Sequence, residues 1–269
     1  MSTARRSTRA SVKGKRTART AGKEAQDLNQ QVQAVLASLE RLGSRRYRDS
    51  LPRYGIHVVK VFGVAVSKMQ ALAKRLGKSH DLAVALWETG WYEARMMAAF
   101  LDEPEPVTPT QMDRWSKDFD NWGICDTLCF HLFDRTPYAY DKVEEWSRRA
   151  DEFGKRAAFA LLACLALHDK QTGDAPFVHG LRLIEHAVTD ERNFVKKGVS
   201  WALRLIGRRN LQLNKAAVAL SQRLAASPNA TSRWIGRGAL KELTSPAVMR
   251  RVEAKNGTSR NKLKKPRKR

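Results

Sequence analysis

Apolar residues recur at three- and four-residue spacing along almost the whole chain, which predicts helices throughout. No alternating run of polar and apolar residues is long enough to indicate a β-strand. Helix starts are predicted at Thr108-Pro109 and Ser245-Pro246, and Ser227-Pro228-Asn229 predicts a break. The sequence therefore predicts an all-α fold. Its helices are expected over residues 26–42, 66–76, 79–89, 91–102, 108–118, 121–133, 139–150, 151–168, 175–189, 191–208, 213–226, 231–243 and 245–254.

The short links predict antiparallel helix pairs, and the second helices of several pairs resemble one another. Each carries a base near its start and continues into small and aliphatic residues, as after Arg95, Arg156, Lys197 and Arg233. The separations of 41 and 36 residues between the last three are near the period of HEAT-like repeats. Stacking such pairs predicts a right-handed type of solenoid with a concave, basic face. The alternative is that Lys and Arg are merely frequent in this chain.

Basic residues are concentrated at the two ends of the chain. Residues 1–23 and 255–269 together hold sixteen of the 50 Lys and Arg and none of the 27 Asp and Glu. Both ends also lack the apolar side chains that would offset chain entropy, so they are expected to be disordered. We therefore predict basic tails over residues 1–25 and 255–269 around one repeat domain over residues 26–254.

Tails of this kind favour a polyanion, and nucleic acid is the preferred partner because binding phosphates releases counterions. An anionic membrane is the weaker alternative, and no apolar run is long enough for a span or a secretory signal. A mitochondrial transit peptide is a further alternative for the acid-free start, although it lacks an apolar helical face. The expected location is the cytoplasm, in association with the nucleoid.

Three cysteines do not make a disulfide framework, which fits a reducing compartment. Cys125 and Cys129 stand one helical turn apart, as do Cys164 and His168, so a zinc site is one interpretation. The preferred interpretation is that these cysteines are small buried residues on packed helices, and no cofactor or metal is expected.

The densest cluster of aromatic and acidic residues covers residues 115–129. Within it Trp122 and Asp126 are four residues apart and share one face of a helix. Arg156 is near the start of a later repeat helix, and Trp201 lies midway along the next. If these helices line one concave face, two indoles, a carboxylate and a guanidinium could surround a common point.

Residues 121–129, Asn-Trp-Gly-Ile-Cys-Asp-Thr-Leu-Cys, resemble the helix that bears the catalytic aspartate in AlkD-type DNA glycosylases. This is the HEAT-like-repeat family of DNA alkylation repair enzymes. Segments around residues 61–74, 86–95 and 191–204 are similar to other parts of the family in the same order. The resemblance covers roughly residues 45–245 and excludes both tails.

The resemblance implies roles for five residues. Asp126 matches the catalytic aspartate, and Trp122 and Trp201 match the two tryptophans beside the damaged nucleotide. Arg156 matches an arginine that contacts the DNA backbone near the lesion, and Lys197 is the base that precedes the second tryptophan. The implied activity is base excision of 7-methylguanine and 3-methyladenine from double-stranded DNA, with the lesion left stacked, by a protein expected to be monomeric.

The chemistry of the reaction fits one carboxylate. A purine alkylated at N3 or N7 leaves as a neutral base without a general acid, whereas the sugar becomes cationic and needs a negative neighbour. Two alternatives stay open, namely a non-catalytic protein that binds damaged or branched DNA and a scaffold for protein partners. The remaining tryptophans are assigned to packing, and the histidines show no compelling ligand spacing. These tryptophans are Trp87, Trp91, Trp115, Trp146 and Trp234.

Overall fold

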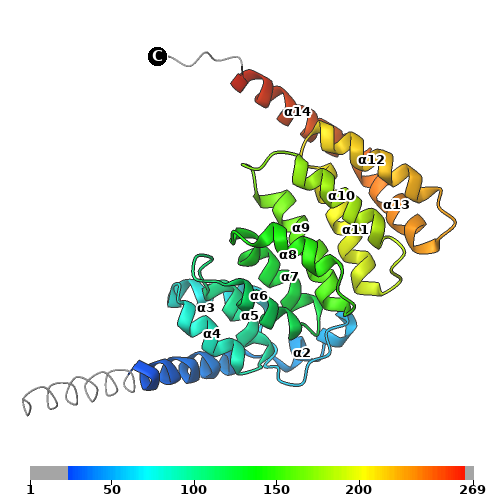
Figure 1. The fold of residues 1–269 in the computed structure, drawn as a ribbon. Coiled ribbons are helices and arrows are strands. Elements are labelled where there is room, and N and C mark those ends of the chain that lie inside the picture. Colours follow the sequence, from blue (N-terminus) through cyan, green and yellow to red (C-terminus); the bar gives the residue numbers. More distant parts are fainter. Residues whose placement is uncertain (1–23, 264–269) are drawn as a thin grey trace, which may run out of the picture. The chain divides into compact units, whose positions relative to one another are not determined.

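The computed structural model describes residues 24–263, with side chains described up to residue 255. Its contacts divide the chain into two compact units, one ending at Glu103 and one beginning at Pro104. All regular structure in the described residues is helical, which confirms the predicted all-α class (Figure 1). The predictions for residues 1–23 and 264–269 fall outside the described part.

The first unit is a small group of helices that begins with a helix over residues 24–42. The other elements are α2 (Arg45–Arg48), a 3-10 turn (Leu51–Tyr54), α3 (Val66–Leu76), α4 (His80–Glu88) and α5 (Tyr92–Leu101). Helix α5 packs on both α3 and α4, and eight of its ten residues are buried. This unit therefore has its own apolar core around α5.

A buried carboxylate fixes the segment that leads into α3. Glu93 on α5 is fully buried and accepts hydrogen bonds from the backbone N–H groups of Phe62 (3.0 Å), Gly63 (2.7 Å) and Val64 (3.1 Å). Gly63 has φ of +85°, and a Cβ there would lie 2.4 Å from the carbonyl oxygen of Ser44. Only glycine fits this conformation and space without strain.

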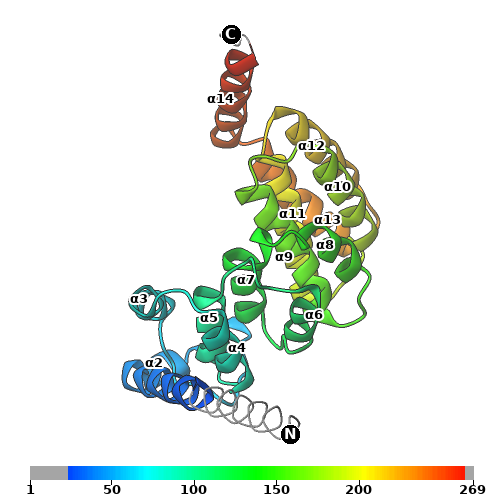
Figure 2. The same ribbon diagram turned by 60° about the vertical axis from the view of Figure 1, so that its left-hand side comes forward.

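The second unit consists of consecutive helix pairs, as Figure 2 shows. Its elements are α6 (Pro109–Lys117), α7 (Trp122–His131), a 3-10 turn (Phe133–Arg135), α8 (Ala139–Ser147), α9 (Glu152–His168), α10 (Ala175–Ala187), α11 (Asn193–Gly207), α12 (Leu211–Ala225), α13 (Ala230–Leu243) and α14 (Pro246–Leu263). Helix α9 packs against α7 and α8 and against α11, and α11 packs in turn against α13. Three of the four helices predicted to be equivalent, α9, α11 and α13, thus form one row, and the fourth, α5, belongs to the first unit.

Helix α9 is the centre of this unit because neighbours cover it on most sides. Every residue from Ala157 to Ala166 is buried, and all are apolar. An all-round apolar helix is stable only when it is enclosed in this way. The close approach of α13 to α12 depends on glycine, since a Cβ at Gly236 on α13 would lie 2.4 Å from the backbone nitrogen of Ala225 on α12.

The predicted capping residues are confirmed at the helix boundaries. Thr108 accepts from the backbone N–H of Gln111 at 3.1 Å, ahead of the proline that starts α6. Asn229 in the predicted break caps α13 through the N–H of Ser232 at 2.8 Å. Two features differ from the prediction. Residues 45–54 form short helical turns that the apolar pattern did not indicate, and α14 runs to Leu263, beyond the expected end at residue 254.

Most of the tryptophans assigned to packing are in the core, but one is not. Trp87, Trp115 and Trp146 are at most 1% exposed, and Trp91 stacks on Phe62 with ring centroids 4.0 Å apart. Trp234 is 50% exposed on α13, so its assignment to the core was wrong. Residues one turn away on α13, such as Arg237 and Gly238, are exposed as well, so Trp234 lies on the exposed side of this helix.

The three cysteines are free thiols buried in the second unit. Cys125 and Cys129 on α7 donate to the carbonyl oxygens of Phe153 and Ala157 on α9, at 3.7 and 3.6 Å. They therefore pack α7 onto α9, as the preferred interpretation of the cysteines predicted. None of the helices in the described residues is long and apolar enough to cross a lipid bilayer.

Candidate functional site

The start of α7 positions Trp122 and Asp126, the two candidate site residues of the aromatic and acidic cluster at residues 115–129. Asn121 is fully buried, and its side chain caps the helix by accepting from the backbone N–H of Ile124 at 3.0 Å. Trp122 is therefore the first residue of α7, and Asp126 follows one turn later on the same face. Trp122 is partly exposed, as a residue that receives a ligand must be.

Asp126 and Arg156 form a two-point ion pair between α7 and α9. The Nε of Arg156 donates to one carboxylate oxygen of Asp126 at 2.8 Å, and the Nη2 donates to the other at 2.6 Å. The Asp126 side chain is 19% exposed, whereas that of Arg156 is 7% exposed. The carboxylate is thus held from inside the protein, and the Asp126 side chain is not completely buried.

The third nitrogen of Arg156 ties the pair to α11. Its Nη1 donates to the backbone carbonyl of Phe194 at 2.8 Å, and the guanidinium carbon lies 5.9 Å from the centre of the Phe194 ring. The N–H of Phe194 donates in turn to Glu152 at 2.9 Å. These bonds connect the first turns of α9 and α11. Each of the three guanidinium nitrogens of Arg156 makes a hydrogen bond within the protein.

Burial and the attraction between the two charges act in opposite directions on the pKa values of the pair. Burial raises the pKa of Asp126 above the ordinary value of 3.8, while the charge and hydrogen bonds of Arg156 act in the opposite direction. Burial alone would lower the pKa of Arg156, but the Asp126 carboxylate raises it above the ordinary value. The guanidinium is therefore charged at every physiological pH, and the carboxylate is the member of the pair that titrates on the acid side.

Trp201 lies on α11, about one turn beyond the point where that helix packs against Arg156. Gly198 contacts Arg156, and Trp201 follows three residues later, a rise of roughly 4.5 Å along the helix axis. The indole is partly exposed and lines a cavity of about 310 Å³ between the end of α9, α11 and α14. The structure thus brings Asp126 and Arg156 into direct contact, whereas Trp201 lines a separate cavity near the other end of α9.

Lys197 is exposed near the start of α11, and its Nζ lies 5.7 Å from the centre of the Phe194 ring. The preceding Lys196 lies at the same distance from the exposed Trp234 ring. Neither Lys196 nor Trp234 was predicted from the sequence to be a site residue. The two residues are 38 positions apart in the sequence. Their contact could not be predicted without the register of α11 against α13.

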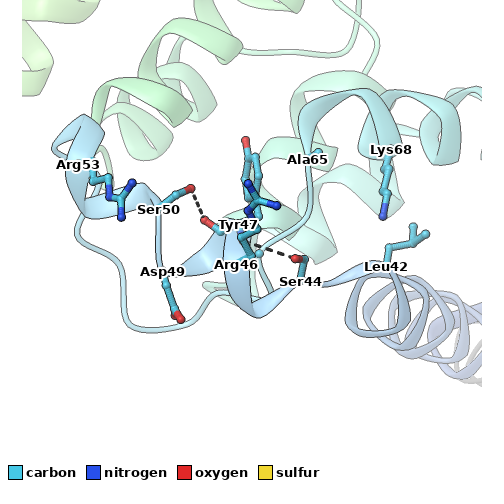
Figure 3. A pocket seen from close by; sticks show the side chains of 10 residues that line it. Leu42, Ser44, Arg46, Tyr47, Asp49, Ser50, Arg53, Ala65 and Lys68 are labelled. Carbon is cyan, nitrogen blue, oxygen red and sulfur yellow. Dashed lines mark hydrogen bonds between the residues drawn. The ribbon is translucent and has the colours of Figure 1, made fainter.

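A second cavity, of about 780 Å³, lies in the first unit, and Figure 3 shows its lining. Three exposed bases, Arg46, Arg53 and Lys68, contribute to it. Two serines in the cavity lining bond to the backbone of Tyr47. Ser50 donates to the carbonyl oxygen of Tyr47 at 2.6 Å, and Ser44 accepts from the N–H of Tyr47. The cavity adds mainly basic surface to the first unit, and five of its ten lining residues fall in the short helical turns that the sequence did not predict.

The arrangement defines an all-helical repeat protein with a fixed carboxylate at the start of one repeat helix. Over residues 35–243 the chain matches the family described as DNA alkylation repair enzyme. The chain therefore belongs to that family, and the predicted resemblance is confirmed.

One solved structure shares the fold with a TM-score of 0.65 and 22% sequence identity, covering 77% of this chain and 95% of that one. It is described as a new family of proteins related to the HEAT-like repeat DNA glycosylases with affinity for branched DNA structures. None of the curated proteins compared with the chain matches it. The HEAT-like repeat fold predicted from the sequence is thus confirmed.

Proposed function

We propose that this protein is a DNA glycosylase that hydrolyses the N-glycosidic bond of cationic alkylated purines in double-stranded DNA. The observation that carries the proposal is the fixed Asp126 carboxylate, which Arg156 holds at two points and whose side chain is 19% exposed. Membership of the DNA alkylation repair enzyme family supports it. The substrates proposed are 7-methylguanine and 3-methyladenine, which are released to leave an abasic site.

The reaction needs a negative charge beside the sugar. An alkylated purine already carries a positive charge, so it leaves as a neutral base when the glycosidic bond breaks. The positive charge then moves to the deoxyribose, where a preorganised carboxylate stabilises it and orients the attacking water. Asp126 supplies this charge, and an indole such as that of Trp122 adds cation–π attraction of about 0.5–2 kcal/mol.

Arg156 has a positioning role in this proposal. In the DNA-free protein its two contacts neutralise much of the charge that Asp126 presents. A DNA phosphate near the guanidinium would compete for that positive charge, so the carboxylate would act more strongly on the sugar once the duplex is bound. The DNA-backbone contact expected for Arg156 stays a prediction, since three of its nitrogens bond within the protein.

A base-release assay tests the proposal. Purified protein is incubated with duplex DNA containing 7-methylguanine, and the free base is measured by mass spectrometry. Asp126→Asn keeps the shape of the side chain but removes the charge, so release is expected to slow by about 100-fold or more. Binding of undamaged duplex is not expected to weaken, because the carboxylate repels phosphate rather than attracting it.

Asp141→Asn is the matched control, since Asp141 is an exposed aspartate on α8 away from the ion pair. It should release the base at the wild-type rate. A wild-type protein that releases no modified base, or an Asp126→Asn variant with full activity, would show that the glycosylase assignment is wrong.

A second candidate is a protein that binds branched or damaged DNA without cleaving it. The affinity for branched DNA attributed to the similar structure favours this alternative, as does the internal pairing of Asp126. It predicts tighter binding to a four-way junction than to a linear duplex of the same length. It also predicts that Asp126→Asn leaves every measurable property on DNA unchanged.

A further inference from the structure

The cavity beside Trp201 is lined by bases from three helices. Four of its ten lining residues are cationic and none is acidic. The remaining wall is apolar and includes the partly exposed Trp201 and the exposed Leu167. The four bases are Lys170 after α9, Arg208 at the end of α11, and Arg251 and Lys255 on α14.

These bases are held close enough to repel one another. The pKa of Lys255 is lowered by burial and then by four cations, which are Lys170, Arg208, Arg209 and Arg251. Burial and Arg209 likewise lower the pKa of Lys170. Among the described residues, Glu242 pairs with Arg208 at 3.4 Å but is shared with Arg204 at 3.5 Å, and the charge of Asp169 opposes the lowering of the pKa at Lys170. The cluster thus has an excess of positive charge that an anion would relieve.

The first part of α14 is firmly placed. Val248 and Val252 are one turn apart, are 7% and 0% exposed, and seat the helix where it packs against α12 and α13. The Nζ of Lys255 donates to the backbone carbonyl of Arg208 at 2.9 Å, which satisfies a carbonyl at the end of α11. Helix α14 begins at Pro246, beyond the family match that ends at residue 243.

We propose that this cavity binds a phosphodiester group of the DNA duplex, with the adjoining sugar against Trp201. A volume of about 310 Å³ is larger than one phosphate needs, and its apolar wall suits the sugar. The inference rests on the proposed function for its ligand, and it adds a DNA contact that the family match does not cover. Helix α14 thereby becomes part of the DNA-binding surface.

Charge removal on α14 tests the contact. Arg251→Gln with Lys255→Gln changes two exposed cavity residues, and Arg250→Gln with Lys215→Gln removes the same charge from exposed positions outside the cavity. Affinity for an undamaged linear duplex is measured across a range of salt concentrations. The cavity variant should reduce the salt slope by about 1, the loss expected for one phosphate contact. The control should change it by much less, and equal changes in both variants would overturn the proposal.

Lysine labelling gives a second readout that does not depend on folding of a variant. The full-length protein is briefly acetylated with and without duplex DNA, and modified lysines are measured by mass spectrometry. DNA should protect Lys170 and Lys255 but leave Lys215 on α12 reactive. Unchanged labelling of both cavity lysines would overturn the proposal. Equal protection by inorganic phosphate alone would do the same, because it would indicate a site for free anions.

The two proposals fail in different ways. A wild-type protein that binds duplex but releases no alkylated base contradicts the glycosylase proposal and leaves the cavity contact in place. A protein that releases bases, but whose cavity and control variants bind DNA alike, contradicts the cavity contact alone. Absence of any DNA binding by the wild type would contradict both.

Discussion

Arg156 contacts both carboxylate oxygens of Asp126, at 2.8 Å through Nε and at 2.6 Å through Nη2. Such a two-point contact fixes the plane of the carboxylate as well as its position. Because the same guanidinium also bonds the carbonyl of Phe194, the orientation of Asp126 depends on α7, α9 and α11 together. This is a site built on rigid helices rather than on loops, which favours the preorganisation that electrostatic catalysis requires.

Replacing Arg156 should affect both stability and activity. Arg156→Ala leaves a mostly buried carboxylate without its partner, which is expected to cost about 3 kcal/mol in the free energy of unfolding. Arg156→Lys keeps the charge but cannot make the two-point contact, so it should fold and still release bases more slowly than the wild type. Urea denaturation and single-turnover base release measure the two effects.

The control for stability is Arg148→Ala. Arg148 pairs with Glu144 on the surface, with 74% of its side chain exposed. Loss of an exposed pair of this kind costs about 0–1 kcal/mol. If Arg148→Ala and Arg156→Ala destabilise the protein equally, or if Arg156→Lys releases bases at the wild-type rate, the positioning role of Arg156 is refuted.

The pH dependence of base release follows from the direction of the Asp126 shift. Burial raises the pKa of this carboxyl above 3.8, so the group gains its proton at a higher pH than an exposed aspartate does. Protonation removes the negative charge, and the rate should therefore fall as the pH drops through that raised pKa. No loss from this pair is expected on the alkaline side, because Asp126 raises the pKa of Arg156 above its already high value.

Single-turnover rates measured across the acid range check this, after subtraction of the depurination seen without protein. The residual rate of Asp126→Asn should lack the acid limb, since asparagine does not titrate. A wild-type rate that stays level down to the ordinary pKa of an aspartate would contradict the assignment.

The sequence predicts the helices well because their signals are local. Cap residues such as Thr108 and the regular apolar spacing specify where α6 and its neighbours begin, without reference to the rest of the chain. The pairing of Asp126 with Arg156 is different in kind. Thirty residues separate them, and their contact depends on the register of α7 against α9, which no short pattern encodes.

The exposure of single side chains and the positions of cavities could not be predicted from the sequence either. Trp234 is a large aromatic residue on a predicted helix and was therefore assigned to packing, but it lies on the exposed side of α13. The basic cavity beside Trp201 combines bases from α9, α11 and α14, which are up to 85 residues apart. In the sequence Lys255 belongs to a basic tail, and only the extension of α14 places it against the end of α11.

Trp122 should contribute to base release through its ring. Trp122→Ala is expected to slow release by about 2- to 30-fold, which corresponds to a cation–π contribution of about 0.5–2 kcal/mol. Trp122→Phe retains a ring face and should recover much of the rate, whereas a purely structural role would show as a lower melting temperature in both variants. Trp234→Ala, which removes an exposed indole from α13, is the control and should leave the single-turnover rate unchanged.

The terminal bases should govern affinity for DNA rather than the chemistry. Removing residues 1–23 and 264–269 deletes thirteen Lys and Arg without an acid, while α14 and its cavity lysine are kept. Fewer released counterions should make the affinity for undamaged duplex weaker and its salt dependence shallower. Base release at saturating protein should stay near the wild-type rate, because the truncation leaves α7, α9 and α11 unchanged. A single-turnover rate that falls in proportion to the affinity would mean that the ends also act in the chemical step.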